Sequence, residues 1–460
     1  MSDFDPTKKS TDAEAMSDYL ETVNDVLGGI KAIQRNWKKY AVKFPYEREE
    51  RFELRKQLSV MTNVFKDVTE SLASKPFQRE VTVKNETSAF APLIEDIDGQ
   101  GNNLSVFAGD TFYRGITDSI TWIRVDYPDG KLFNSREEER QAGVRPYWVR
   151  VPHYDIIDVQ SERSNGGEQL TYVRMWEDKN TIIEMWPASW KRWKLTDEGW
   201  RAEKEGAITI GEIPLVPYAT GRRHGRKWQF LPPLLDALNA QIELMRKESD
   251  KEFAEVMTCF PMLSANGVSP AKDANGEPLP LKTGPNAVLY APMNANGQAG
   301  SWSYVEPTTA SLKHLSEQIE IKIQSIREIG KQPLTAQSGN LTRISALAAS
   351  NKANSAVQQW ALGLKDALEN AMRITAKWLN ETQEPEVEVY TDFRASDDDD
   401  TTPALLLQMR AAGDLSQQTL YREMKRLGRL SDDFDPEEEQ IKIAEDLSKQ
   451  YLDESTDRMV

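Results

Sequence analysis

The stretch LPPLLDALNAQIELMRKESD, residues 231–250, sets the architecture of the second half of this 460-residue chain. Its apolar residues return at intervals of three and four positions, a spacing that places them on one face of an α-helix. Two prolines at the start suit the first turn of a helix, where their missing N–H groups are not needed. The pattern predicts a long helix over Pro233–Phe260, and Pro261 ends it.

A second helix is predicted to return after a short insertion rich in turn signals. The insertion, Met262–Pro307, contains three Asn-Gly pairs and several prolines, and its segments PMLSAN, AVLYAP and SWSYVEP have the composition of strands. It is too short to fold as a robust independent domain. The returning helix covers Ala310–Ile329. The order of helix, small β insertion and helix therefore predicts a projecting stalk with a tip.

A polar segment, IGKQPLTAQSGNLTRIS at residues 329–345, separates this stalk from a third and longer helix over Ser345–Asn380. It contains glycine, proline and amide side chains, but no nucleophile–base pair and no set of metal ligands. The short strand EVEVY and the acidic linker SDDDDTTP follow the third helix. Short helices over Ala404–Tyr451, with breaks near Gly413 and Gly428-Arg429, complete the chain.

The first half combines helices with a mainly antiparallel sheet. Apolar spacings of three and four predict helices within Ala13–Phe77, Ala89–Ile97 and Leu104–Ile116. From Ser119 to Val216 the chain changes to β-branched and aromatic segments separated by turn residues. Residues 171–201 predict an antiparallel meander with turns at DKN and DEG. The fold class predicted from these patterns is α+β.

The composition restricts the function. A net charge of −16 argues against a protein that coats nucleic acid, although DNA could slide past it without sticking. The single cysteine, Cys259, excludes an intramolecular disulfide and fits a reducing compartment. No apolar run is long enough to cross a bilayer, and the N-terminus lacks the pattern of a secretion signal. We expect a protein made in the cytoplasm, with no membrane partner.

Sequence motifs of catalysis are missing. The chain has no phosphate-binding loop, dinucleotide fingerprint, nucleophile elbow or HExxH pair. His153, His224 and His314 fall in different elements, and Asp397–Asp400 is interpreted as a solvated linker because adjacent carboxylates splay apart. We therefore expect no catalytic residue, no metal site and no cofactor.

Three further features receive structural interpretations. Cys259 is interpreted as a small packed hydrophobe. The loop GRRHGRK, Gly221–Lys227, is interpreted as solvated or as a salt-bridge partner between subunits, rather than as a phosphate site. Five tryptophans in the predicted sheet are interpreted as core and subunit contacts, because interleaved acids argue against a base-stacking platform. They are Trp176, Trp186, Trp190, Trp193 and Trp200.

The order of elements resembles that of the portal proteins of tailed bacteriophages, from about Leu54 to the C-terminal helices. The likeness rests on FKDVTESLASKP, on LSVFAGDTFYRGITDSITWIRVDYP, on IPLVPYATGRRHG leading into the helix quoted above, and on IREIGKQPLT. Together with the order of helix, β insertion, helix and polar loop, these segments carry the resemblance.

The resemblance implies a portal-type α+β fold with named parts. They are an α/β wing at residues 1–230, a stem helix at 231–261, a small β-rich clip at 262–308, a second stem helix at 309–330, a tunnel loop at 331–344, a long wing helix and short strand at 345–395, and an acidic linker with a helical crown at 396–460.

The resemblance also implies partners and a location. A portal is a homo-oligomeric ring, typically a dodecamer, at one capsid vertex of the virion, and double-stranded DNA is packaged and ejected through it. It is assembled in the bacterial host cytoplasm among major capsid and scaffold proteins. Its clip docks the terminase large subunit and later the head–tail connector or adaptor proteins. ATP hydrolysis belongs to the terminase, so no enzymatic activity is expected of this chain.

Two sets of residues follow from the resemblance. The tunnel loop would place Lys331, Gln332, Gln337, Ser338, Asn340, Thr342 and Arg343 at the DNA channel. The clip would offer Asn266, Lys272, Asp273, Asn275, Glu277, Asn294 and Asn296 to docking partners. Lys331 and Arg343 would make weak, salt-sensitive phosphate contacts if they face the bore, and ring contacts if they face neighbouring subunits.

Two alternatives stay open. One is a carboxylate-based hydrolase, nuclease-like or glycosidase-like, with its acids in the tryptophan-rich sheet, because glycosidases combine aromatic platforms with paired acids. The other is a different ring-forming structural protein of the virion.

Overall fold

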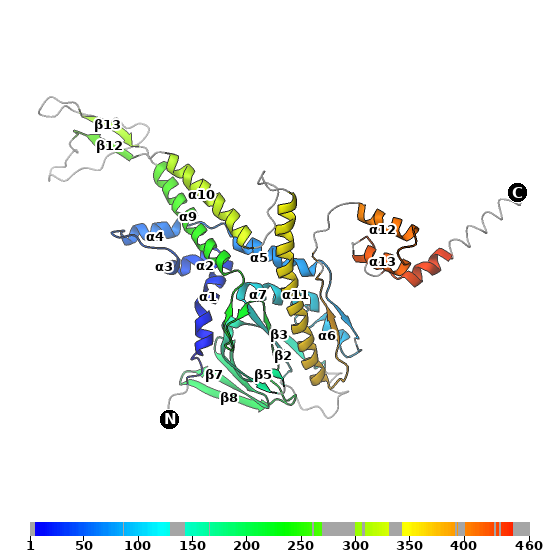
Figure 1. Cartoon of the computed structure of the whole chain (residues 1–460). Coiled ribbons are helices and arrows are strands. Elements are labelled where there is room, and N and C mark those ends of the chain that lie inside the picture. The colour runs from blue at the N-terminus through cyan, green and yellow to red at the C-terminus, as the bar shows by residue number, and fades with distance from the viewer. Residues whose placement is uncertain are drawn as a thin grey trace, which may run out of the picture. The chain divides into compact units, whose positions relative to one another are not determined.

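The computed structural model describes residues 5–85, 87–128, 143–164, 166–259, 262–268, 300–305, 309–330, 343–391, 393, 401–426, 429–431 and 434–444. The chain divides into two compact units, Met1–Phe393 and Arg394–Val460. The predicted α+β class is confirmed (Figure 1). The functional names given to parts of the chain stay predictions.

The N-terminal region is helical, as predicted, but it is a series of separate helices. These are α1 (Thr11–Leu27), α2 (Ile30–Arg35), α3 (Trp37–Tyr40), α4 (Glu49–Gln57) and α5 (Val64–Ser74), followed by η1 (Lys75–Phe77), α6 (Ala91–Glu95) and α7 (Leu104–Asp118). The side chains of Ser10, Asn63 and Asn103 cap α1, α5 and α7 by accepting backbone N–H bonds from three residues further on.

A three-stranded antiparallel sheet lies at the centre of the first unit. Its order is β3 (Tyr147–Pro152), β2 (Ile120–Asp126) and β9 (Leu215–Ala219). Ile120 and Trp122 of the central strand face one hydrophobic core, and Ile123 and Val125 face another. Successive side chains of a strand point to opposite faces of the sheet. This strand is therefore buried on both sides.

A five-stranded antiparallel sheet confirms the predicted meander. Its order follows the sequence: β4 (Ile156–Ser164), β5 (Gly167–Asp178), β6 (Thr181–Trp186), β7 (Ser189–Thr196) and β8 (Gly199–Ala207). The second core lies between this sheet, α1 and β2, and includes Trp122, Met175 and Ile183. The first and larger core joins the N-terminal helices to the long helix α11 (Arg343–Leu379).

The predicted stalk is present as two neighbouring helices, α9 (Leu235–Cys259) and α10 (Thr309–Ile329). Between them β12 (Met262–Asn266) pairs with β13 (Ser301–Val305), as predicted for PMLSAN and SWSYVEP; AVLYAP lies outside the described residues. The bounds of α9, α10 and α11 differ from the predicted ones by no more than two residues. Shorter pairs join β1 (Thr82–Lys84) to β14 (Glu386–Glu388), and β10 (Arg222–Arg223) to β11 (Phe230–Leu231).

The second unit is helical where it is described, with α12 (Thr401–Ala411), α13 (Gln417–Arg426) and a helical segment at 436–444. Thr401, Thr402 and Pro403 were predicted to belong to the linker, and that prediction was wrong. They form the first turn of α12, where a proline is tolerated because its missing N–H has no helical partner to lose. The break near Gly413 is confirmed, with a positive φ of 84° at that glycine.

Candidate functional site: a braced helical hairpin and its strand tip

The hairpin of α9 and α10 ends in a strand tip that extends away from the sheets (Figure 1). The register of β12 and β13 runs from Met262 opposite Val305 to Asn266 opposite Ser301. Asn266, a predicted docking residue, is exposed at the far end of β12. The other predicted docking residues lie outside the described residues: Lys272, Asp273, Asn275, Glu277, Asn294 and Asn296.

The base of the hairpin belongs to the larger core. Leu234, Leu238 and Leu244 are almost fully buried near the start of α9, and Ile326 is buried near the end of α10. Beyond Ser249, each described side chain of α9 is at least partly exposed. The hairpin is therefore anchored at its base, and its outer half stands in solvent.

A buried amide fixes the position of α9 against the start of α5. Gln241 accepts a hydrogen bond from the Phe65 N–H at 3.0 Å and donates one to the Thr62 carbonyl at 2.9 Å. Ser249 and Glu248 bind the segment between α4 and α5. The Val60 N–H donates to Ser249 Oγ, and the Thr62 N–H donates to Glu248. Buried polar groups are costly to leave unpaired, so these bonds hold the helix in one register.

An arginine on α4 braces the hairpin further out. Arg55 donates to Glu47 at 3.0 Å and to Asp250 of α9 at 3.2 Å, and it also donates to the Val42 carbonyl. The Arg55 and Glu47 side chains are both largely buried. Breaking such a pair leaves an uncompensated buried charge. Sequence reasoning missed this brace, because Arg55 and Asp250 are 195 residues apart and each reads as a surface charge on its own helix.

The end of α10 is held tightly against α5. The Gly330 N–H donates to the Ile326 carbonyl at 2.7 Å. A Cβ atom at Gly330 would lie 2.5 Å from Cγ1 of the buried Val68, so this position has no room for a side chain. Arg327 also pairs with Asp67 at 3.3 Å. The chain therefore leaves the hairpin at a fixed point beside α5.

The predicted channel segment begins directly after this point. Lys331, Gln332, Gln337, Ser338, Asn340 and Thr342 lie outside the described residues, and Arg343 is the first residue of α11. The assignment of these seven residues to a channel stays a prediction, as does the direction in which Lys331 and Arg343 point.

The hairpin carries more negative than positive charge. Helix α9 has six carboxylates against three cations, and α10 has three of each. Lys322 pairs with Glu243 across the two helices at 2.7 Å, and its hydrogen bond lowers the pKa of that carboxyl. A surface of this kind attracts no phosphate backbone, because phosphate binding depends on excess cations.

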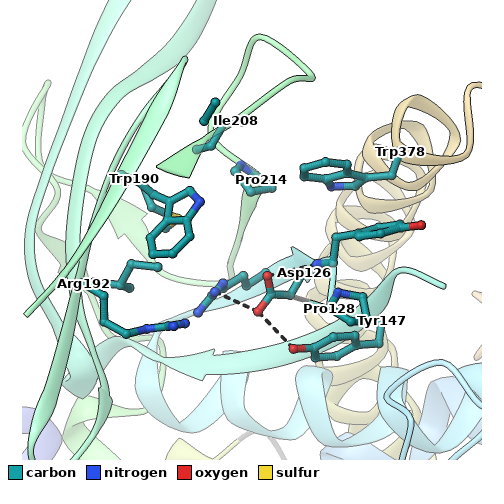
Figure 2. Close-up of a pocket in the computed structure, with 13 residues that line it drawn as sticks. Asp126, Pro128, Tyr147, Trp190, Arg192, Ile208, Pro214 and Trp378 are labelled. Carbon is teal, nitrogen blue, oxygen red and sulfur yellow. Dashed lines mark hydrogen bonds and ion pairs between the residues drawn. The ribbon is translucent and has the colours of Figure 1, made fainter. Parts of the chain in front are cut away.

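A separate pocket of about 330 Å³ opens between the two sheets, and Figure 2 shows it. Trp190 forms one wall, and Trp378 faces it from the opposite side. Tyr127 stacks on Trp378 with ring centroids 5.4 Å apart. Asp126 and Tyr147 lie at the floor, where the Tyr147 hydroxyl donates to Asp126 at 3.2 Å, and Arg124 also lines the pocket. Burial and the nearby Asp126 raise the pKa of Tyr147 to about 12.

The charges around this pocket are paired with one another. Arg124 binds Asp126 at 2.7 Å and Glu177 at 2.8 Å, while Arg192 binds Glu177 at 2.6 Å. Burial alone would raise the pKa of Glu177, but the hydrogen bonds and charges of the two arginines outweigh it and lower the pKa. The carboxylates of Asp126 and Glu177 are therefore both held in ion pairs. The pocket therefore gives no support to the paired acid and base of the hydrolase alternative.

The three histidines lie apart, as predicted. His153 is buried and accepts a hydrogen bond at Nδ1 from Trp122, and burial lowers its pKa to about 3. His224 follows β10, and His314 is on α10. Within the described part of the chain, no group of three or more His, Cys, Asp or Glu side chains could hold a metal ion. Cys259 is the last residue of α9, and its packing stays a prediction.

The exposure of Arg222, His224, Arg226 and Lys227 agrees with the interpretation of GRRHGRK as a solvated loop. Arg223 differs from them, because it binds Glu168 at 2.6 Å and lies 4.2 Å from the centre of the Trp228 ring. The interpretation of the five sheet tryptophans as core residues needed correction, because each of them is at least partly exposed, although Trp190 packs against the second core. The core of the sheets instead uses Trp122 and Trp148 on the doubly covered three-stranded sheet. Subunit contact by the other five stays a prediction.

None of the helices described is long and apolar enough to cross a membrane.

Comparison with known proteins gives a family of unknown role. Residues 233–379, from just before α9 to the end of α11, match the family described as a domain of unknown function, DUF4055. This match treats the hairpin, its tip and the long helix as one unit, over about a third of the chain. No curated protein matches the chain.

Among solved structures, the chain is similar to proteins of gene transfer agent (GTA) particles. One is a chain from the neck of an empty GTA particle computed with C6 symmetry, with 10% identity, a TM-score of 0.44 and coverage of 80% of this chain and 90% of that one. Another, from the neck of a native GTA particle computed with C12 symmetry, has 10% identity, a TM-score of 0.38 and coverage of 77% and 87%. A chain of the virion of a native GTA particle has 11% identity, a TM-score of 0.40 and coverage of 86% and 97%. At these TM-scores the likenesses carry no argument about function.

Proposed function

We propose that this protein is a portal subunit. Copies of it form a closed ring at one capsid vertex, and double-stranded DNA is packaged and ejected through the ring. The observation that carries the proposal is the hairpin of α9 and α10, which is braced at its base, carries a strand tip and is followed by the 37-residue helix α11. In this assignment the hairpin is the stem, the tip is the clip, and residues 331–344 form the tunnel loop.

The exposed outer half of the hairpin supports assembly into a ring. Beyond Ser249 each described side chain of α9 is at least partly exposed, and so is each side chain from Leu312 to Ser316 on α10. Neighbouring copies in a ring with head-to-tail contacts would cover such surfaces, because each copy presents one face to the next and the rotation closes. The hairpin then lines the ring.

The charge of the hairpin supports a channel for DNA. An excess of carboxylates on α9 repels phosphates, so a duplex would not be trapped by cation contacts while it moves. The tunnel loop would follow the moving duplex through largely uncharged residues. In the same assignment the clip docks the terminase large subunit during packaging and the head–tail connector proteins afterwards, and the portal itself performs no catalysis.

Two measurements test the proposal. Negative-stain imaging and mass photometry of the purified chain are expected to show rings with a central hole and a mass that is a whole multiple of the 52.3 kDa subunit. A compact monomer under all assembly conditions would overturn the proposal. Deleting residues 332–340 is expected to leave the rings intact and to impair DNA packaging or retention. Loss of the rings on that deletion would contradict the placement of the tunnel loop.

A further inference from the structure

An apolar loop beside the hairpin is exposed although it is firmly held. The loop connects α3 to α4, and Val42, Phe44 and Tyr46 within it are 63%, 52% and 104% exposed. Arg55 lies 4.5 Å from the centre of the Phe44 ring and binds both Val42 and Glu47, so the loop is tied to α4 and to α9. An apolar surface that is exposed and rigid is suited to binding another protein.

The conformation of Tyr46 points to the same conclusion. The Glu47 N–H donates to the Phe44 carbonyl at 3.1 Å, which closes a turn with Pro45 and Tyr46 at its centre. Tyr46 has a φ of 63°. Glycine or asparagine normally occupies such a position, because a bulky side chain is strained there. Tyr46 combines a strained backbone with a fully exposed ring, so it does not stabilise the single chain. Such a residue is suited to a contact with another molecule.

The segment that leads into this loop is basic, although the protein as a whole is acidic. Between Asp25 and Glu47 the sequence holds no carboxylate and five cations, which are Lys31, Arg35, Lys38, Lys39 and Lys43. Lys39 pairs with Asp18 and Glu21, and Lys43 pairs with Glu49. Lys31, Arg35 and Lys38 are exposed and form no ion pair within the described residues. Three positive charges are thus available to an acidic partner.

The same chain carries a segment of opposite charge in the same unit. Between Lys377 and Arg394 there is no cation, and there are five carboxylates: Glu381, Glu384, Glu386, Glu388 and Asp392. Glu384 and Glu386 are exposed beside and within β14. Figure 1 shows α3 and α4 on one side of the first unit, and the end of α11 with the segment that follows it on the other.

We infer that the basic, apolar surface of α2, α3 and the loop 42–46 docks against residues 381–388 of a second copy of this chain. The inference rests on the proposed ring, because a head-to-tail contact needs two different and complementary surfaces on one subunit. Charge complementarity steers the two surfaces together, and Tyr46 and Phe44 bury their rings at the contact. DNA is the weaker candidate, since the aliphatic Val42 gains nothing from a phosphate backbone.

A charge-swap experiment tests the contact. The variant K31E/R35E/K38E is expected to reduce ring assembly about tenfold or more, because like charges then face each other. E381K/E384K/E386K is expected to do the same, and the six changes together should restore rings. The control R410E/R422E/K442E makes an equal charge change at exposed residues of the second unit and should assemble normally. Loss of rings in both triple variants without rescue would overturn the assignment of the two surfaces to each other.

A substitution at Tyr46 separates docking from folding. Tyr46→Gly relieves the strained φ, so the thermal stability of the single subunit should stay the same or rise, while ring assembly falls. Unchanged ring assembly would show that Tyr46 is not part of the contact between subunits.

Other occupants give distinct results. Normal rings that lose duplex DNA binding in K31E/R35E/K38E would assign the surface to DNA, and normal rings that lose terminase binding would assign it to that partner. Both outcomes overturn the inference and leave the proposed ring intact. Absence of rings in the unmodified chain overturns the proposed function itself.

Discussion

The two halves of the α9–α10 hairpin are built from the same helices but are stabilised in different ways. At the base, Leu244 and Ile326 are buried in the main core, and Gln241 binds two backbone groups of the α5 region. In the outer half, the described side chains of both helices remain partly or fully exposed. The base therefore depends on this chain alone. In the proposed ring, neighbouring copies would cover the outer half.

The largest effect is expected from breaking the brace that Arg55 of α4 forms with Glu47 and with Asp250 of α9. Arg55→Ala leaves Glu47 buried without its partner and should lower the free energy of unfolding by about 3–5 kcal/mol. Chemical denaturation of the variant measures the loss. Lys56→Ala, next to it on the same helix, should change stability by less than about 0.5 kcal/mol. Equal losses for the two variants would show that Arg55 is not a brace.

The next largest effect is the loss of stability on truncating a leucine in the base of the hairpin, compared with the same change in the outer half. Leu244→Ala should cost about 2–5 kcal/mol, because it opens a cavity among fully buried side chains. Leu315→Ala on α10, where the leucine is only half-buried, should cost the isolated subunit much less. Denaturation of both variants under conditions that keep the chain monomeric measures the difference. A loss at Leu315 as large as that at Leu244 would contradict the division into base and outer half.

A smaller effect is expected where α10 ends. Gly330→Ala places a methyl group against the buried Val68 and should cost about 1–3 kcal/mol, although alanine favours a helix more than glycine does. Val68→Ala destabilises the core by itself, but in that background Gly330→Ala should cost less, because only its contact with the Ile326 carbonyl at 2.9 Å remains. A thermal-unfolding double-mutant cycle measures the coupling. Additive losses would mean that the two residues do not meet.

The smallest effect is expected from the ion pair across the hairpin. Lys322 lowers the folded-state pKa of Glu243 below its usual 4.5, so the pair stabilises the protein above about pH 4.5 and is lost as the pH falls through the lowered pKa. More than half of the Glu243 side chain is exposed, so solvent screening limits the effect to about 0.5 kcal/mol.

Measuring the free energy of unfolding of Glu243→Gln at pH 6 and at pH 3 tests the direction of this pH dependence. The variant should lose stability at the higher pH and match the unmodified chain at the lower one. Glu320→Gln on the exposed side of α10 is the control, with no difference expected at either pH. A destabilisation that grows as the pH falls would contradict the direction of the shift.

The helices of the hairpin could be predicted because their signal is local. Apolar residues at intervals of three and four gave α9, α10 and α11 to within two residues, and prolines marked their limits. The meander could be predicted for the same reason, since β-rich runs and turn residues alternate along the chain. The brace at Arg55 could not, because its partner Asp250 belongs to a distant segment and no spacing rule links them.

The tryptophans show where local reasoning failed. Residue type alone suggested that the five sheet tryptophans were buried, although Trp186 is 36% exposed and Trp122 is fully buried. Burial depends on which other element covers a given face of a sheet. The order of amino acids thus established the helices, the strands and the uneven charge of this protein, because each depends on neighbours along the chain. Folding in three dimensions alone settled which surfaces are covered, which charges are paired and which apolar loop stays exposed, because each of these depends on contacts between segments far apart in the sequence.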